Sequence, residues 1–246
     1  MTGMDMSFFK GKDGCIMDWK CQLGIIVPSW NTTMEYECWR MAPEGVSIHA
    51  SRIAHTADSD EASLRMAEKA PGAAELLAHA KVQAICFGCT GGSFRKLGVD
   101  QEIIKNIETL TKTPTTTTST AILDALKHLQ IKSVAIASPY AERTNGLLAK
   151  FLEYSGFRVA SQKGLDVECP AFLPPESAYR LAMDVDCKDA DMILISCTNF
   201  RSMEVIRQLE KELGKPVVSS NSASMWKLLQ LAGVKRKVEG LGRLFE

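Results

Sequence analysis

The chain has 246 residues, 46% hydrophobic and 24% charged, and its formal net charge at pH 7 is zero. These values are typical of a globular protein with one large domain or two smaller lobes. The balanced charge argues against nucleic acid or a membrane surface as the main partner. Residues 1–20 lack a sustained apolar stretch, so we predict a flexible tail rather than a signal peptide, and a cytoplasmic location.

Short apolar runs alternate with segments of helical period along the chain. This alternation predicts an α/β protein in which helices cover parallel sheets. The apolar stripe of Ile103, Ile104, Ile107 and Leu110 is one such helix face, which we assign to the core. The predicted strands are, in chain order, 23–28, 46–51, 82–88, 113–118, 133–138, 158–162, 192–196 and 215–220.

The strand signals of the second half repeat those of the first in the same order. The run around Pro28 matches the run around Pro139, and the run ending at Cys89 matches the one ending at Cys197. An internal repeat of this kind predicts two pseudo-symmetric Rossmann-like lobes, each with a parallel four-stranded sheet. The predicted boundaries are 21–118 for the first lobe and 119–220 for the second.

The chain contains eight cysteines. Without an export signal they belong in a reducing compartment, so we expect mostly thiols rather than disulfides. Cys86 and Cys89 form a C-x-x-C pair, but a structural zinc site needs a second ligand pair at similar spacing, and the remaining cysteines and histidines do not supply one. We therefore predict no bound metal, and we interpret Cys86, inside its strand, as a small buried side chain.

Cys89 and Cys197 each follow a buried strand and precede a turn, in ICFGCTGGSF (85–94) and MILISCTNF (192–200). Ligands of open parallel sheets bind beyond the carboxyl ends of the strands. If the lobes face each other, the two thiols lie on opposite sides of one cleft. A thiol near a helix N-terminus is more acidic than usual and can serve as nucleophile or acid/base. The matched positions favour a catalytic pair over simple burial.

The turns after the two cysteines carry groups that can hold an anion. Thr90, Gly91 and Thr198 offer backbone N–H groups and hydroxyls, which stabilise a carboxylate or a developing enolate. The predicted substrate is therefore a small carboxylic acid.

Further candidate binding residues follow the first strand of each half. Pro28 and Asn31 lie at the predicted cleft edge, where the Asn31 amide can bind a carboxylate or cap the helix that begins near Thr32. Ser29 shares this edge. Tyr140 is the counterpart in the second half; its phenol can donate to the substrate or form a plain wall.

Across residues 20–246 the sequence resembles the aspartate/glutamate racemase superfamily, whose members have two similar α/β lobes and a cysteine from each lobe across the cleft. IVPSWNTTME (26–35) resembles the opening motif of maleate cis-trans isomerases. STAILDALKHL (119–129), PVVSSNSASMWKLLQLAG (216–233) and GRLFE (242–246) are similar to arylmalonate decarboxylases. Those decarboxylases carry glycine at the position of Cys89 and one cysteine at that of Cys197, whereas this chain has both thiols.

The resemblance implies that residues 221–246 cross back to the first lobe. It also implies a cofactor-independent isomerase that converts maleate to fumarate, as a monomer or homodimer. Cys89 would add to the alkene as a thiolate and Cys197 would supply and reclaim the proton. Asn31, Tyr140 and the N–H groups of Thr90 and Thr198 would hold the carboxylates and the enediolate.

Three other functions stay open at this point. Two-cysteine proton transfer in an amino acid or hydantoin racemase, decarboxylation of an arylmalonate, and non-catalytic carboxylate binding all fit the pattern. The isomerases also place a second asparagine in the second lobe, and residues 166–175 contain none.

Overall fold

The structure, a computed structural model, describes residues 21–246 except 58, 236, 237 and 239. The tail predicted for residues 1–20 therefore lies outside the described residues. Two four-stranded parallel sheets form the framework, with strand orders β2-β1-β3-β4 and β6-β5-β7-β8. The shared order confirms the α/β fold with two matching sheets, and all eight predicted strands are present. Their bounds are β1 Cys21–Pro28, β2 Val46–Ile53, β3 Ala84–Phe87, β4 Thr115–Thr117, β5 Ser133–Ser138, β6 Arg158–Gly164, β7 Met192–Ile195 and β8 Val217–Ser219.

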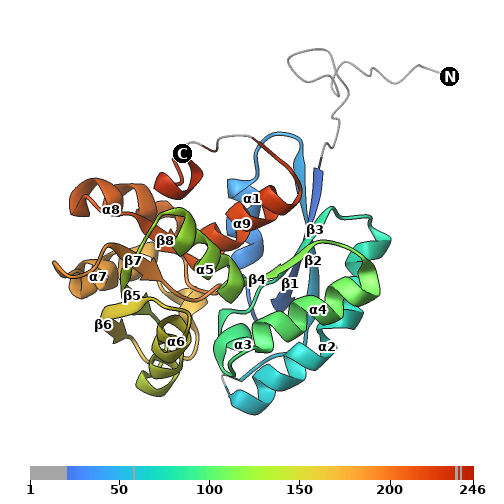
Figure 1. The fold of residues 1–246 in the computed structure, drawn as a ribbon, viewed down its shortest axis with the longest axis horizontal. Coiled ribbons are helices and arrows are strands. Elements are labelled where there is room, and N and C mark those ends of the chain that lie inside the picture. The colour runs from blue at the N-terminus through green and yellow to red at the C-terminus, as the bar shows by residue number, and fades with distance from the viewer. Residues whose placement is uncertain (1–20, 58, 236–237, 239) are drawn as a thin grey trace.

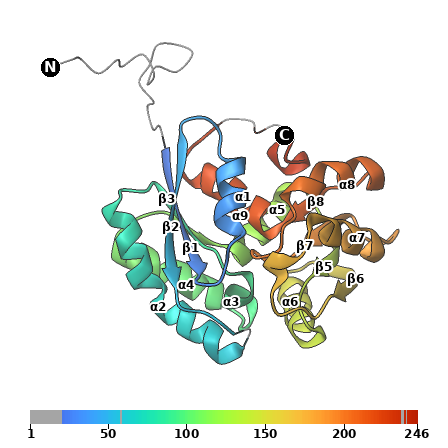
Figure 2. The ribbon, with the colours of Figure 1, turned by 180° about the vertical axis from the view of Figure 1, so that it is seen from behind.

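Helices cover both faces of each sheet, and the two sheets with their helices lie side by side (Figures 1 and 2). Helices α2, α3 and α4 lie beside the first sheet, α6, α7 and α8 beside the second, and α1, α5 and α9 between the two. Their bounds are α1 Met34–Met41, α2 Asp60–His79, α3 Thr90–Phe94, α4 Val99–Thr111, α5 Thr118–His128, α6 Glu142–Tyr154, α7 Pro175–Val185, α8 Ile206–Leu213 and α9 Ser220–Leu231.

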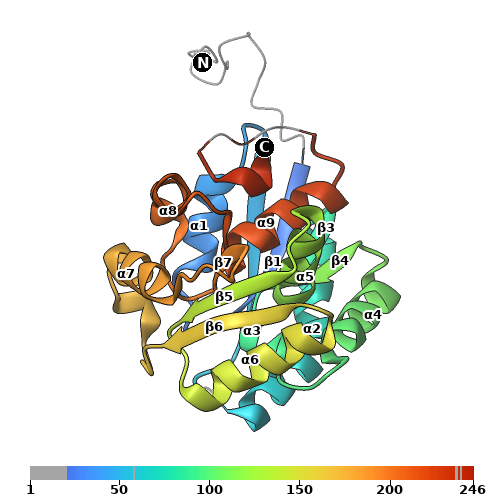
Figure 3. The same cartoon turned by 60° about the vertical axis from the view of Figure 1, so that its left-hand side comes forward.

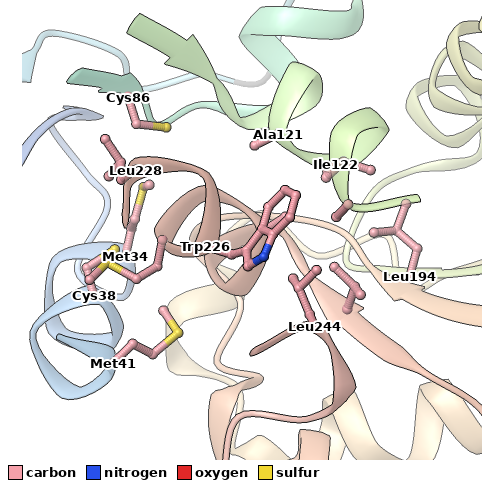
Figure 4. Close-up of a cluster of buried hydrophobic side chains, with 14 of the residues drawn as sticks. Met34, Cys38, Met41, Cys86, Ala121, Ile122, Leu194, Trp226, Leu228 and Leu244 are labelled. Carbon is pink, nitrogen blue, oxygen red and sulfur yellow. The ribbon is translucent and has the colours of Figure 1, made fainter. Parts of the chain in front are cut away.

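A single apolar cluster joins the facing sides of the two sheets. It combines Cys86 of β3 and Leu194 of β7 with side chains of α1, α5 and α9 (Figure 4). Trp226 of α9 is only 8% exposed in this cluster, near Ala121 and Ile122 of α5. Burial of apolar surface is the main stabilising contribution to such packing. The shared core therefore fixes how the sheets face each other.

Helix α9 follows β8 of the second sheet but packs against α1, β3 and β4 of the first and alongside α5 (Figure 3). The last turn of the chain returns to the second sheet, because the Arg243 backbone N–H donates to the Glu210 carboxylate of α8 at 3.0 Å. The lobe boundaries 21–118, 119–220 and 221–246 stay a prediction.

The predicted core stripe of α4 is partly wrong. Ile103 and Ile107 are buried, but Leu110, in the last turn of the helix, is 50% exposed. Across the described ranges, no helix is long and apolar enough to cross a membrane.

Candidate active site

The first thiol is placed by the end of β3, whose four residues are all buried. Gly88 follows, and a Cβ there would lie 2.4 Å from the Met34 sulfur and 3.0 Å from the Ile26 carbonyl oxygen, so a larger residue would require the Met34 side chain to move. Cys89 then caps α3: its Sγ accepts the Gly92 N–H at 3.3 Å. An N–H directed at sulfur favours the thiolate form. Backbone geometry therefore prepares Cys89 for nucleophilic chemistry.

The second thiol follows β7 in the same way. Cys197 has a φ of +142°, a region that residues other than glycine rarely adopt. The Ser220 Oγ accepts the Cys197 N–H at 3.0 Å, and the Cys197 Sγ accepts the Asn199 N–H at 3.4 Å. Strained backbone persists only where surrounding contacts hold it, and it concentrates at functional sites.

A cavity of about 580 Å³ opens between the carboxyl ends of the two sheets. Its walls come from both halves of the chain, as the internal repeat predicts. Except for Ser29, the structure brings together the residues singled out from the sequence as site candidates. They are Pro28, Asn31, Cys89, Thr90, Gly91, Tyr140, Cys197 and Thr198.

Asn31 both caps a helix and contacts the second half of the chain. Its Oδ1 accepts the N–H groups of Thr33 and Met34 at 3.0 and 2.9 Å, at the start of α1. Its Nδ2 donates to the Thr198 hydroxyl at 3.0 Å. The Asn31 side-chain nitrogen carries two N–H bonds, and the one that does not bond Thr198 remains for a ligand. The two roles considered from the sequence are thus compatible.

Tyr140 lies beside both thiols. Burial, and then the negative charges of Cys197 and Cys89, raise the pKa of Tyr140 well above its ordinary value, against the lowering effect of hydrogen bonds with Ser196 and Thr90. The phenol therefore stays protonated through the neutral range and acts as a hydrogen-bond donor. Its ring packs edge-on to Phe94 at 6.1 Å between centroids, which fixes its orientation.

Hydrogen bonds across the two halves hold the cysteine turns in register. The Thr198 hydroxyl donates to the Gly88 carbonyl at 3.1 Å, and the Thr90 hydroxyl donates to the Ser220 Oγ at 3.0 Å. Each bond connects the turn carrying one thiol to the turn or helix next to the other. The separation of the thiols is thus set by the protein before a ligand enters.

A buried carboxyl group of α1 holds the segment that follows Cys197. Glu37 of α1 is fully buried, and its Oε1 accepts the N–H groups of Ser202 and Met203 at 2.8 and 3.0 Å. Its Oε2 accepts from Asn221, which also donates to the Thr198 carbonyl. Burial raises the pKa of Glu37 above its usual value, despite these donors. No sequence motif marks Glu37, because its partners lie more than 160 residues away.

Cys86 faces the other way from Cys89. It is fully buried in the core shared by the two sheets, and burial raises its pKa to about 12. This placement agrees with the prediction that Cys86 is a small buried side chain. The seven described cysteines are all thiols, and Cys15 lies outside the described residues. Within the described ranges, no group of three or more His, Cys, Asp or Glu side chains is placed to hold a metal ion.

One wall of the cavity, formed by residues that follow β1 and β2, was not predicted from the sequence. Trp30, His55 and Ser63 line it, and the Trp30 and His55 rings meet edge to face at 5.9 Å. Ser29, predicted at the cleft edge, instead uses its Oγ to accept the backbone N–H of His55 at 3.1 Å. The position of His55, just past the end of β2, was the available signal, since β2 also ends at this edge. On the second sheet, residues 166–170 form the opposite wall.

Comparison with known protein families shows which family this chain belongs to. The family described as arylmalonate decarboxylase matches residues 23–245, nearly all of the described chain. The chain belongs to this family.

A maleate isomerase from Pseudomonas putida (strain KT2440) is 26% identical over 240 residues, 91% of this chain and 96% of that protein. Arylmalonate decarboxylase from Bordetella bronchiseptica is 35% identical over 139 residues, 54% of this chain and 58% of that protein. Among solved structures, a variant of the maleate isomerase from Pseudomonas putida S16 with maleate has a TM-score of 0.88 and 25% identity, covering 92% of this chain and 97% of that one.

Proposed function

We propose that this family member is a cofactor-independent isomerase that converts maleate to fumarate. Two thiols, one from the end of β3 and one from the end of β7, line a single cavity with neutral hydrogen-bond donors. The similarity to maleate isomerases over 91% of the chain supports the substrate.

The first step is addition of the Cys89 thiolate to one alkene carbon. A C–S bond forms and the π electrons move to the adjacent carboxylate as an enediolate, which the Tyr140 phenol and nearby N–H groups stabilise. The Cys197 thiol then gives its proton to the other alkene carbon. The product of the step is a succinyl thioether with a single bond where the double bond was.

Rotation about that single bond places the carboxylates trans. The Cys197 thiolate takes back the proton from carbon, the electrons re-form the double bond, and the C–S bond to Cys89 breaks. Fumarate leaves, with both thiols restored to their starting protonation states. Atoms and electrons balance without an added redox partner.

The observation that carries the proposal is the convergence of Cys89 and Cys197 on one cavity from equivalent strand ends. The test is proton NMR of the purified protein with maleate in D₂O. Fumarate is expected with the wild type and none with Cys89→Ser. With Cys197→Ser, intact-protein mass spectrometry is expected to show an adduct of one maleate at Cys89, since solvent can supply the proton to carbon whereas a serine hydroxyl is too weak a base to remove it.

A Cys86→Ser variant is the matched control, because Cys86 is a neighbouring thiol outside the cavity. It is expected to keep turnover. Wild-type protein that leaves maleate unchanged contradicts the proposed function. α-Deuterium exchange into aspartate or glutamate in the same solvent would instead establish a racemase.

Decarboxylation is a second candidate, favoured by the 35% identity to the Bordetella bronchiseptica enzyme. This reaction needs one thiol to protonate the enediolate left after loss of carbon dioxide. Cys89→Gly keeps Cys197 and removes the other nucleophile. Release of carbon dioxide from phenylmalonate by this variant, but not by Cys197→Ser, would place that activity within one substitution of the native site.

A further inference from the structure

A dicarboxylate in this cavity must place its second carboxylate away from the thiols. The first carboxylate occupies the donors around Thr90, Thr198 and Tyr140. The cavity, at about 580 Å³, has the volume of pockets that bind much larger molecules, so two opposite walls are available for the second group. The charges on those walls differ.

The wall on the second sheet is acidic. It includes the carboxylates of Asp166 and Glu168. Among the described residues that line the cavity, neither lysine nor arginine is present to offset them. Both residues are exposed, so water screens their charges, but like charges at close range still repel. A substrate carboxylate on this wall would therefore be destabilised.

The wall on the first sheet has the opposite character. Ser63 of α2 lines it and is 3% exposed, yet its Oγ has no hydrogen-bond partner in the protein. A buried hydroxyl without a hydrogen-bond partner costs free energy, so such a group normally bonds to a ligand or to water. The Ser63 backbone N–H is already bonded to the Ser59 carbonyl, which leaves the hydroxyl as the polar group of Ser63 without a partner.

His55 lines the same cavity and contacts the residue before Ser63. It is 6% exposed, and its Nδ1 is 3.3 Å from the carbonyl of Ala62, the residue before Ser63. A carbonyl only accepts, so the proton is on Nδ1. The edge-to-face contact with Trp30 further fixes the ring. In its protonated form the imidazole brings a positive charge to the wall.

We propose that Ser63 and His55 form the subsite for the second carboxylate of the substrate and so determine the preference for dicarboxylates. The inference rests on the proposed function for the identity of the substrate. The Ser63 hydroxyl donates to one carboxylate oxygen, and the protonated imidazole donates to the same carboxylate through its Nε2–H. Both residues are specificity determinants for binding, and neither takes part in bond making at the alkene.

The test measures binding of succinate and butyrate, saturated acids that cannot add a thiol. Isothermal titration is performed on wild type, Ser63→Ala, His55→Gln and Ser133→Ala. Ser133 is the matched control, because its Oγ is also buried and without a partner but lies outside the cavity. Wild type is expected to prefer succinate. Ser63→Ala and His55→Gln are each expected to reduce that preference about tenfold, the effect of losing a hydrogen bond to a charged group.

Thermal unfolding separates binding from folding. Ser63→Ala removes an unpartnered buried hydroxyl, so its melting temperature is expected to equal or exceed that of the wild type. Succinate preference that is unchanged in both subsite variants, or lowered equally by Ser133→Ala, overturns the subsite. Absence of succinate binding to the wild type also overturns it.

The failure of the subsite and that of the proposed function give different results. Maleate turnover by the wild type, with unchanged succinate preference in Ser63→Ala, overturns the subsite alone. Succinate preference that depends on Ser63, in a protein that leaves maleate unchanged, supports the subsite and overturns the proposed isomerisation.

Discussion

Replacing Glu37 by alanine is expected to destabilise the protein although the residue lies outside the cavity. The substitution removes the acceptor for the N–H groups of Ser202 and Met203 and for the Asn221 amide. Each buried donor left without a partner costs about 1–3 kcal/mol. Water can enter the space left by the side chain and satisfy part of this loss, so the lower end of the range applies to each group.

Three donors at the lower end give a loss of about 3 kcal/mol in the free energy of unfolding. For a chain of this size, that loss corresponds to a fall of about 6–12 °C in melting temperature. Urea unfolding and calorimetry measure both quantities. Glu37→Gln keeps an acceptor for the two backbone N–H groups, so its loss is expected to be smaller than that of the alanine variant.

Glu68→Ala, on the exposed side of α2, is the control for removal of a glutamate. It is expected to unfold like the wild type. A Glu37→Ala variant whose unfolding free energy lies within about 1 kcal/mol of the wild type would refute the reasoning, since it would show that the three hydrogen bonds add nothing net.

Three further predictions follow from the pKa shifts. Burial raises the pKa of the Glu37 carboxyl above its ordinary value of 4.5, so its contribution to stability is present below pH 4.5 and declines as the pH rises through the folded pKa. In urea unfolding from pH 4 to 8, Glu37→Gln is expected to remove this decline. An unchanged pH profile in Glu37→Gln would contradict the prediction. Hydrogen bonds from Arg143 and Arg95 lower the pKa of Asp60 to about 2, so its contribution to the free energy of unfolding is present above pH 3.8 and is lost as the pH falls towards 2. Because Asp60 is half exposed, Asp60→Asn is expected to lower the free energy of unfolding by at most about 1 kcal/mol at pH 7. In urea unfolding, this difference from the wild type is expected to vanish in acid. Brief iodoacetamide treatment at neutral pH is expected to label Cys89 and Cys197, with protection by succinate, and to spare Cys86, whose pKa is about 12; peptide mapping that finds all three labelled equally would argue for an inert binding protein.

Local pattern was sufficient to predict the strands and the placement of the two thiols. A buried parallel strand is a continuous apolar run, and β1, β3, β5 and β7 each show one, so their positions are visible in the sequence. The internal repeat then assigns Cys89 and Cys197 to equivalent strand ends. Since parallel strands end at the same edge, this information also predicted that the candidate residues meet in one cavity.

The supporting contacts were decided only by the tertiary structure. Asn31 caps α1 and also reaches Thr198, while Glu37 holds the turn after Cys197. The cavity wall of His55 and Ser63 likewise becomes evident only when the loop after β2 is placed beside α2. These contacts join single residues that are far apart or lie in an irregular loop, so they leave no periodic signal in the sequence. Periodicity records which face of an element is buried, whereas the partner on that face is determined by how the two sheets pack around their shared core.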